Sequence, residues 1–150
     1  MRFLGFIFLS LSFGAIIVAL DYFLPGNYLE NFLTSYLVET FAIFIGLNTA
    51  AIIFLLGQLT EIEFKAGKMS LFSETKIELK HNIYLLIFSF CLALILLIFR
   101  PASNELDTNF LTIYFFINTT LLVSLFLLAI FALFEILVAV FSINPTINKK

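Results

Sequence analysis

The chain has 150 residues, of which 62% are hydrophobic and only 12% are charged, and its formal net charge is -2. An average soluble domain has about 25% charged residues, and a soluble protein of this length could not bury so much apolar surface in its interior. The composition therefore excludes a soluble globular domain and indicates an integral membrane protein. The slightly negative net charge also gives no reason to expect direct binding to nucleic acid.

The sequence carries no signature of catalysis, cofactor binding or metal binding. It has no glycine-rich phosphate loop, no nucleophile elbow and no paired-histidine metal helix. Its one His and one Cys cannot build a zinc site, and Cys91 has no second Cys for an intrachain disulfide. We therefore predict that the protein is not an enzyme and has no catalytic, cofactor-binding or metal-binding residues.

Four apolar runs predict four membrane-spanning helices, at about residues 3–24, 35–59, 83–99 and 110–133. Each run has about 17 residues or more, the length that a helix needs to cross the hydrocarbon core. The last run is expected to stay helical to about Ser142, where Asn144 and Pro145 would end it. We therefore expect an all-α integral membrane four-helix bundle that forms a single domain over residues 1–150.

The charged segment 60–82 predicts a short helical hairpin that extends spans two and three beyond the membrane. Glu61 and Lys65 are spaced as an i,i+4 ion pair on its first helix. Gly67 is suited to end that helix, because glycine readily adopts the left-handed conformation at a helix C-terminus. Ser73 is suited to cap the second helix, and a capping box that begins at Thr75 is a rival.

Small residues predict where helices pack closely, since they let two backbones approach. Span one carries such a face at Ser10, Gly14 and Val18. A longer face on span two is formed by Ala42, Gly46, Ala50 and Gly57. We expect close helix packing at these faces, including packing against further copies of the chain in a homo-oligomer. A pore or substrate path along the span-two face is the alternative.

Polar residues inside the predicted spans are candidate intramembrane contacts. Asn48 falls near the middle of span two, where an unpaired amide is costly, so we expect it to bond to another helix. Thr49 and Asn118 are further candidates. If several subunits formed a pore, its polar lining would be Asn48, Thr49, Asn118, Thr119, Thr120 and Ser124.

The distribution of basic residues predicts the orientation in the membrane. Placing both termini and the 60–82 hairpin in the cytoplasm leaves only Arg100 outside. The basic residues inside would then be Arg2, Lys65, Lys68, Lys76, Lys80, Lys149 and Lys150. Cytoplasmic segments of membrane proteins are enriched in Lys and Arg. We therefore expect a multi-pass protein of the bacterial inner membrane with cytoplasmic N- and C-termini.

The hairpin also offers a candidate interaction surface that mixes basic and apolar side chains. The residues that we single out are Lys65, Lys68, Phe72, Lys76 and Lys80. Such a surface suits a soluble cytosolic protein, and it equally suits anionic membrane lipid, which attracts lysines next to a span. From the sequence both partners remain open.

Two apolar hairpins, inward termini and the bend from Gly57 to Asn82 give the chain a recognisable layout. Over its whole length this layout resembles the four-helix membrane subunit of the Kiwa anti-phage defence system. The resemblance implies a role at the bacterial inner membrane beside a soluble DNA-binding protein. It rests on layout, and no functional residue is carried over from it.

Three hypotheses for the function follow. The first is a non-enzymatic scaffold or sensor subunit that oligomerises and recruits a soluble cytosolic partner, in anti-phage defence if the resemblance holds. The second is an oligomeric pore-forming or membrane-disrupting effector. The third is a small transporter or flippase, which ranks last because the sequence after span two lacks the basic and aromatic residues of small four-helix flippase-like proteins.

Overall fold

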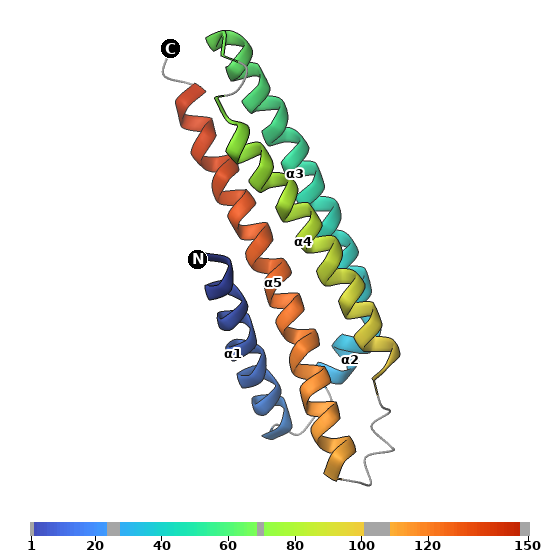
Figure 1. Cartoon of the computed structure of the whole chain (residues 1–150). Helices are drawn as coiled ribbons and strands as arrows, with labels where there is room; N and C mark the ends of the chain where they lie inside the picture. Colours follow the sequence, from blue (N-terminus) through green and yellow to red (C-terminus); the bar gives the residue numbers. More distant parts are fainter. Residues whose placement is uncertain (1, 24–27, 69–70, 101–108, 148–150) are drawn as a thin grey trace.

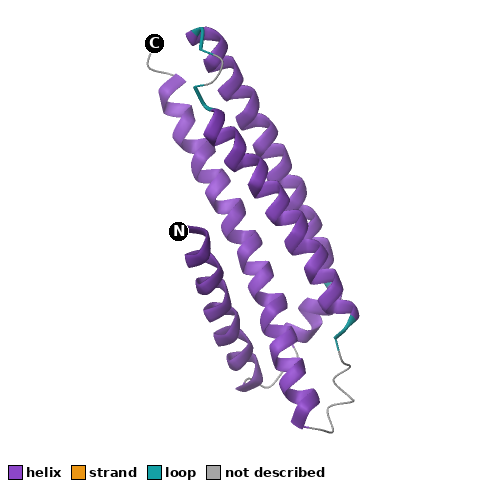
Figure 2. Ribbon diagram, in the orientation of Figure 1, coloured by secondary structure: helices purple, strands orange, loops and turns teal. Residues whose placement is uncertain are grey.

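The structure is a computed structural model that describes residues 2–23, 28–68, 71–100 and 109–147 (Figure 1). The described chain forms α1 (Arg2–Phe23), α2 (Tyr28–Ser35), α3 (Leu37–Ala66), α4 (Ser73–Ile98) and α5 (Asn109–Ile147). Within these ranges all regular structure is helical, which confirms the predicted all-α class (Figure 2). Lys149 and Lys150, which contribute to the predicted orientation, lie outside the described residues.

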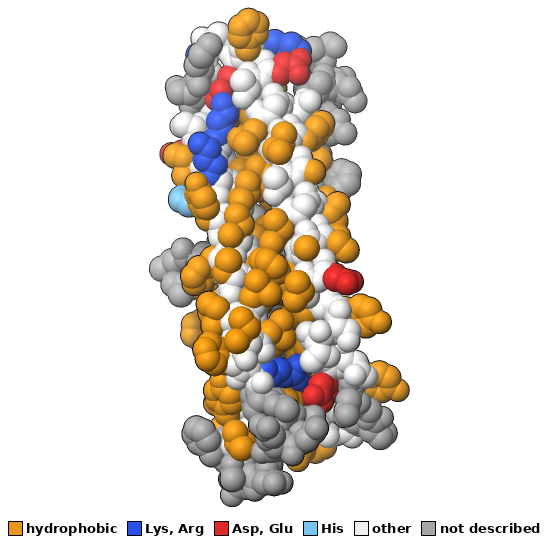
Figure 3. Space-filling model, turned by 90° about the vertical axis from the view of Figure 1, so that its right-hand side faces the viewer, with side chains coloured by type: hydrophobic (Ala, Val, Ile, Leu, Met, Phe, Trp, Pro, Cys, Tyr) orange, Lys and Arg blue, Asp and Glu red, His pale blue; other side chains and the backbone are white. Residues whose placement is uncertain are grey.

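Four helices are long and apolar enough to cross a membrane, over Gly5–Phe23, Leu37–Ala66, Ser73–Ile98 and Leu111–Val140. Their most apolar windows bury only 17% to 33% of their residues inside the chain. The remaining apolar side chains cover the flank of the molecule, and charged side chains gather mainly near its two ends (Figure 3). Such a surface suits a bilayer, where the outer faces of a helix bundle meet hydrocarbon. The chain therefore has the architecture of a multi-pass helical membrane protein.

The central helix is α5, which packs against α1, α3 and α4. With 39 residues it rises about 58 Å, whereas the 22 residues of α1 rise only about 33 Å. The N-terminus of α1 accordingly lies beside the middle of α5, and the α3–α4 hairpin and the end of α5 continue beyond it (Figure 1). The short α2 packs on α3 and α1 at the opposite end.

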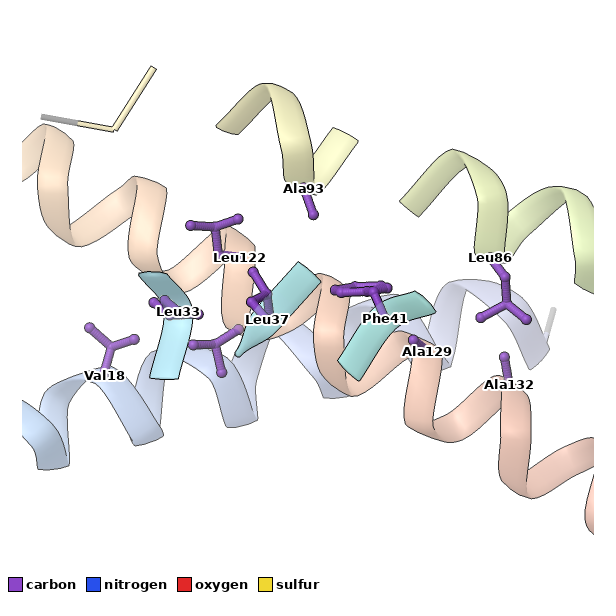
Figure 4. Close-up of a cluster of buried hydrophobic side chains, with 10 residues drawn as sticks. Val18, Leu33, Leu37, Phe41, Leu86, Ala93, Leu122, Ala129 and Ala132 are labelled. Atoms are coloured by element: carbon purple, nitrogen blue, oxygen red, sulfur yellow. The ribbon is translucent and has the colours of Figure 1, made fainter. Parts of the chain in front are cut away.

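Two clusters of buried side chains hold the helices together. The larger cluster draws residues from all five helices and includes Val18, Leu33, Phe41, Leu86 and Leu122 (Figure 4). The smaller cluster joins α3, α4 and α5 nearer the hairpin end, and consists of Ile52, Leu55, Leu59, Leu79 and Ile136. Because the α3–α4 hairpin has this cluster at its base, its outer part is anchored without help from α1.

The small-residue face of span one packs as predicted. A Cβ atom added to Gly14 would run into the Ser124 hydroxyl and would lie 3.1 Å from the carbonyl oxygen of Thr120. Ser10 and Val18 on the same face are also buried. Gly14 therefore marks a close approach of α1 to α5, which confirms the prediction for this face.

The helix ends confirm one sequence signal and correct another. α3 ends at Ala66, and Gly67 follows in the left-handed conformation with φ of 65°. The Gly67 and Lys68 N–H groups donate to carbonyl oxygens of the last turn, which is the expected glycine stop. The prediction that Asn144 and Pro145 end α5 is wrong, because the helix continues to Ile147. Proline removes one hydrogen-bond donor and disfavours helix in the residue before it, but near a terminus the remaining bonds sustain the helix.

Candidate functional site

The strongest candidate site is the part of the α3–α4 hairpin that lies beyond α1, residues 60–81, which we name the projecting hairpin. Phe6, near the start of α1, lines the same cavity as Asn82 of α4, so these two residues lie at similar depth. From Asn82 back to Ser73, α4 rises about 13 Å further. The projecting hairpin therefore stands well clear of the start of α1 (Figure 1).

Glu63 of α3 holds the turn of the projecting hairpin. Its side chain is buried and its Oε1 atom accepts the Phe72 N–H at 2.9 Å, while Oε2 accepts a hydrogen bond from Lys76 Nζ. The backbone carbonyl of the same residue accepts the Lys68 N–H at 3.2 Å. One residue thus closes the end of α3 and fixes the beginning of α4.

This contact corrects the predicted cap of α4. Ser73 is the first helical residue, and the N-cap position is Phe72, which makes no side-chain capping bond. The capping box at Thr75 is also wrong, because the helix starts two residues earlier. The Glu63 carboxylate instead accepts the backbone N–H of Phe72, the N-cap residue, which is the bond that the Glu or Gln of a capping box usually makes.

Two ion pairs of the projecting hairpin lower the pKa of their carboxyl groups. The Lys76 ammonium and the Phe72 N–H hold the pKa of the Glu63 carboxyl below its ordinary value of 4.5. The predicted pair of Glu61 and Lys65 is confirmed with a distance of 2.6 Å, and it lies in solvent. The hydrogen bond from Lys65 and its charge likewise lower the pKa of Glu61. Both carboxylates are therefore ionised at neutral pH.

The predicted contact residues fall into two groups. Phe72 and Lys76 serve the hairpin itself, because Phe72 packs against the smaller core cluster and Lys76 is bonded to Glu63. Lys65, Lys68 and Lys80 are exposed. These three side chains are therefore accessible to a partner, whereas Phe72 and Lys76 contribute mainly to the shape of the site.

The apolar part of the accessible surface comes from other residues. Phe64 is 76% exposed, Leu71 is 51% exposed and Ile77 is 53% exposed. The sequence places all three among the apolar residues of the hairpin that could bind a soluble partner, but it does not tell which of these residues are exposed. Their exposure depends on the helical phase that turns Glu63 inward and Phe64 outward, and this phase is set by how α3 packs against α4. We name the surface formed by Phe64, Leu71, Ile77, Lys68 and Lys80 the tip surface.

The buried amides behave differently from one another. Asn118 donates from Nδ2 to the Leu96 carbonyl oxygen of α4 at 3.0 Å, as an intramembrane cross-helix contact should. Asn48 is fully buried, yet neither its Nδ2 nor its Oδ1 has a hydrogen-bond partner in the described chain. The expected cross-helix bond of Asn48 is therefore wrong. It lies one turn from Phe44 and one turn from Ile52, which pack in the two apolar clusters.

The polar residues that could line a pore face the interior of the chain. Asn48, Asn118, Thr119 and Ser124 are all buried, and Thr49 and Thr120 are half-buried. The Ser124 hydroxyl donates to the Thr120 carbonyl oxygen of its own helix at 2.6 Å. A path between subunits would need these groups on an outer face, so no observation favours the pore hypothesis.

The small-residue face of α3 lies on the outside of the bundle. Ala42, Gly46, Ala50 and Gly57 are exposed, and a Cβ atom added to Gly46 or Gly57 would meet nothing within 4 Å. The face therefore packs against no other helix of the same chain. Its contact with a second copy stays a prediction.

In the part of the chain that the structure describes, no three His, Cys, Asp or Glu side chains are grouped to hold a metal ion. No family model, no curated protein and no solved structure matches the chain.

Proposed function

We propose that the protein is a non-catalytic scaffold or sensor subunit of a bacterial inner membrane, which forms a homo-oligomer and recruits a soluble cytoplasmic protein through the projecting hairpin. The observation that carries the proposal is the exposure of Phe64 and Leu71 near the turn of that hairpin, with Ile77 exposed one turn into α4. Exposed apolar patches with a charged rim are typical of protein interaction sites.

Depth favours a protein partner over lipid at the outer end of the tip surface, where Phe64 and Leu71 lie near the turn of the hairpin. The headgroup layer adds only about 5–8 Å to each side of the hydrocarbon core. If the start of α1 marks the edge of that core, the projecting hairpin rises about 13 Å from the level of Asn82 and passes beyond the headgroups. Phe64 then meets water, where an apolar side chain gains free energy from burial against a protein.

The distribution of charge supports the cytoplasmic assignment. Lys65, Lys68, Lys76 and Lys80 all belong to the projecting hairpin, whereas Arg100 follows α4 at the opposite end of the bundle. This is the positive-inside pattern. The resemblance in layout to the Kiwa membrane subunit supports a partner that is itself the DNA-binding component, with a role in anti-phage defence, while this chain makes no direct contact with nucleic acid.

Oligomerisation through α3 is supported by its unoccupied small-residue face. In lipid, helices associate by close van der Waals packing, for which Gly46 and Gly57 leave room. Mass photometry in mild detergent tests this contact. Gly46→Leu should shift the oligomer to smaller species, and Ile95→Leu on the exposed face of α4 is the matched control. An unchanged mass distribution for Gly46→Leu would contradict the use of this face.

Recruitment is tested by purifying the tagged protein in mild detergent with its neighbouring genes co-expressed. Mass spectrometry should identify one soluble protein in defined stoichiometry, and Phe64→Asp combined with Leu71→Asp should remove it. Phe54→Ala, which alters an exposed apolar residue of α3 within the span, should leave the complex intact. Loss of the partner with Phe54→Ala as well, or its retention by the double variant, would contradict binding at the tip surface.

A further inference from the structure

A groove runs between α1 and α4, with α5 as its floor. A cavity of about 520 Å³ opens at the start of α1 and is lined by α1, α4 and α5. A second cavity of about 270 Å³ continues from it along α1 toward the opposite end of the bundle. Leu85 and Leu128 line both cavities, so together they form one continuous groove.

The larger cavity, at the start of α1, is the polar end of the groove, and we name it the upper cavity. Glu78 and His81 come from α4 and Glu135 comes from α5, and all three side chains line this cavity. Asn82 lines it as well, and donates from Nδ2 to the Ala132 carbonyl oxygen at 3.5 Å. Its Oδ1 atom is buried and has no hydrogen-bond partner in the described chain. The acceptors that the cavity offers to a ligand are therefore the carboxylates of Glu78 and Glu135.

The smaller cavity, which we name the lower cavity, is lined mainly by apolar side chains. Its walls include Ile7 and Leu11 from α1 and Leu92 from α4. Three serines, Ser10, Ser89 and Ser124, also line it, and the hydroxyls of Ser10 and Ser124 each donate to a carbonyl oxygen of their own helix, at 2.9 Å and 2.6 Å. These hydroxyl hydrogens are therefore already engaged, and the wall suits a hydrocarbon chain.

The dimensions of the groove match one leaflet of a bilayer. On α4 the lower cavity is lined from Leu85 to Leu96. Those 11 steps along the helix rise about 16 Å, and one leaflet contributes about 15 Å to the hydrocarbon core. The polar cavity then lies at headgroup depth, beside the start of α1.

We propose that this groove binds one membrane phospholipid whose headgroup ends in a primary ammonium, with an acyl chain in the lower cavity and the ammonium in the upper one. A primary ammonium has three N–H donors. The carboxylates of Glu78 and Glu135 supply acceptors for it, and hydrogen bonds between an ammonium and a carboxylate are stronger than those between neutral groups.

Charge also argues for lipid over a second copy of the chain in this groove. An apolar helix laid over it would bury the Glu78 and Glu135 carboxylates without a cation, which is costly. The small-residue face of α3, by contrast, offers no charge to bury. This inference does not depend on any partner bound at the tip surface.

The absence of Trp from the chain allows a direct test by fluorescence. Leu92→Trp places a single reporter in the lower cavity, and Ile95→Trp places one on the exposed face of the same helix as a control. The full-length variants are reconstituted in phosphatidylcholine vesicles. Phosphatidylethanolamine and phosphatidylglycerol carrying the same brominated acyl chains are then compared as quenchers at equal mole fraction.

For Leu92→Trp, brominated phosphatidylethanolamine should associate about three- to fivefold more strongly than brominated phosphatidylglycerol, the factor that an ion pair at a hydrated surface provides. For Ile95→Trp the ratio of the two association strengths, phosphatidylethanolamine to phosphatidylglycerol, should be near one. Adding Glu78→Gln and Glu135→Gln should bring the ratio at position 92 to near one, and Glu135→Gln alone should lower it partly.

Three outcomes would overturn the proposal. Equal ratios at positions 92 and 95 would show bulk lipid contact, and an unchanged ratio in the Gln variants would remove the role of the carboxylates. Absence of quenching at position 92 by either lipid, with normal quenching at position 95, would show that protein covers the groove.

Discussion

The Glu63 carboxylate on α3 and the Lys76 ammonium on α4 form an ion pair across the turn of the projecting hairpin, 13 residues apart in the chain. The side chain of Glu63 is only 5% exposed, whereas that of Lys76 is 26% exposed. Because the carboxylate also accepts the Phe72 N–H, it fixes the position at which α4 begins. The shape of the proposed recruitment surface therefore depends on one acidic residue.

Removing the charge of Glu63 should loosen the turn. Glu63→Gln keeps the size of the side chain but weakens both the bond to Lys76 and the bond to Phe72, since charged acceptors bond more strongly than neutral ones. Hydrogen–deuterium exchange should show faster exchange of the amides in residues 71–77. Glu61→Gln is the control, because its pair with Lys65 is exposed and exposed pairs contribute little. Equal protection in the two variants would contradict this role of Glu63.

The same ion pair predicts a pH dependence for the projecting hairpin. The folded-state pKa of Glu63 is lowered from 4.5, so the unfolded hairpin takes up a proton first as the pH falls. The stabilisation is therefore fully present above about pH 4.5 and is lost as the pH falls through the folded-state pKa. Exchange of residues 71–77 should accelerate over that range after correction for intrinsic rates. If the exchange rate of residues 71–77 in Glu63→Gln depended on pH as steeply as in the original chain, the pH dependence would not come from Glu63.

Two glycines of similar helical context should respond in opposite ways to alanine. Gly14→Ala places a methyl group against Ser124 and the Thr120 carbonyl, and such overpacking costs about 1–3 kcal/mol. Gly46→Ala meets no atom of its own chain and should gain about 0.5–1 kcal/mol from helix propensity. Equilibrium unfolding in mixed micelles compares the two variants under conditions that keep the protein monomeric. An unchanged stability for Gly14→Ala would contradict the close packing of α1 on α5, and destabilisation by Gly46→Ala would contradict the exposure of the α3 face.

Asn48 should be replaceable by leucine with a gain in stability. A buried polar group without a partner costs about 1–3 kcal/mol, and leucine of similar size removes that cost. Asn118→Leu is the matched comparison, and it should gain less because it loses the bond to the Leu96 carbonyl. The same unfolding assay measures both variants. If Asn48→Leu lowered stability, the amide would have to be bonded in the membrane-embedded protein.

Local signals in the sequence predicted most of the fold. The four spans follow from run length and hydropathy, and the end of α3 follows from Gly67, whose left-handed conformation is a property of that residue and its immediate neighbours. The close packing at Gly14 also followed from sequence, since a small residue at a repeated spacing leaves room for another helix.

Features that depend on contacts across the bundle were not predictable in the same way. Ser73 carried the local signal for a cap, but the N-cap position is Phe72, and its N–H bonds to the Glu63 carboxylate, nine residues earlier, because the turn brings the two together. Glu78 and Glu135 line one cavity although 57 residues separate them, and only the packing of α4 and α5 places them together. The exposed Phe64 depends on the rotation of α3, which hydropathy alone leaves open.

The proposed function requires that a soluble protein in the cytoplasm binds the tip surface of the projecting hairpin. Site-specific photo-crosslinking in intact cells tests it most directly, with benzoylphenylalanine at Phe64 and, as a control, at Phe54 within the span of the same helix. The account predicts one discrete crosslink to a soluble protein from position 64, lost with Leu71→Asp, and no such crosslink from position 54. Crosslinks from position 64 only to lipid, or to the same soluble protein from both positions, would contradict it.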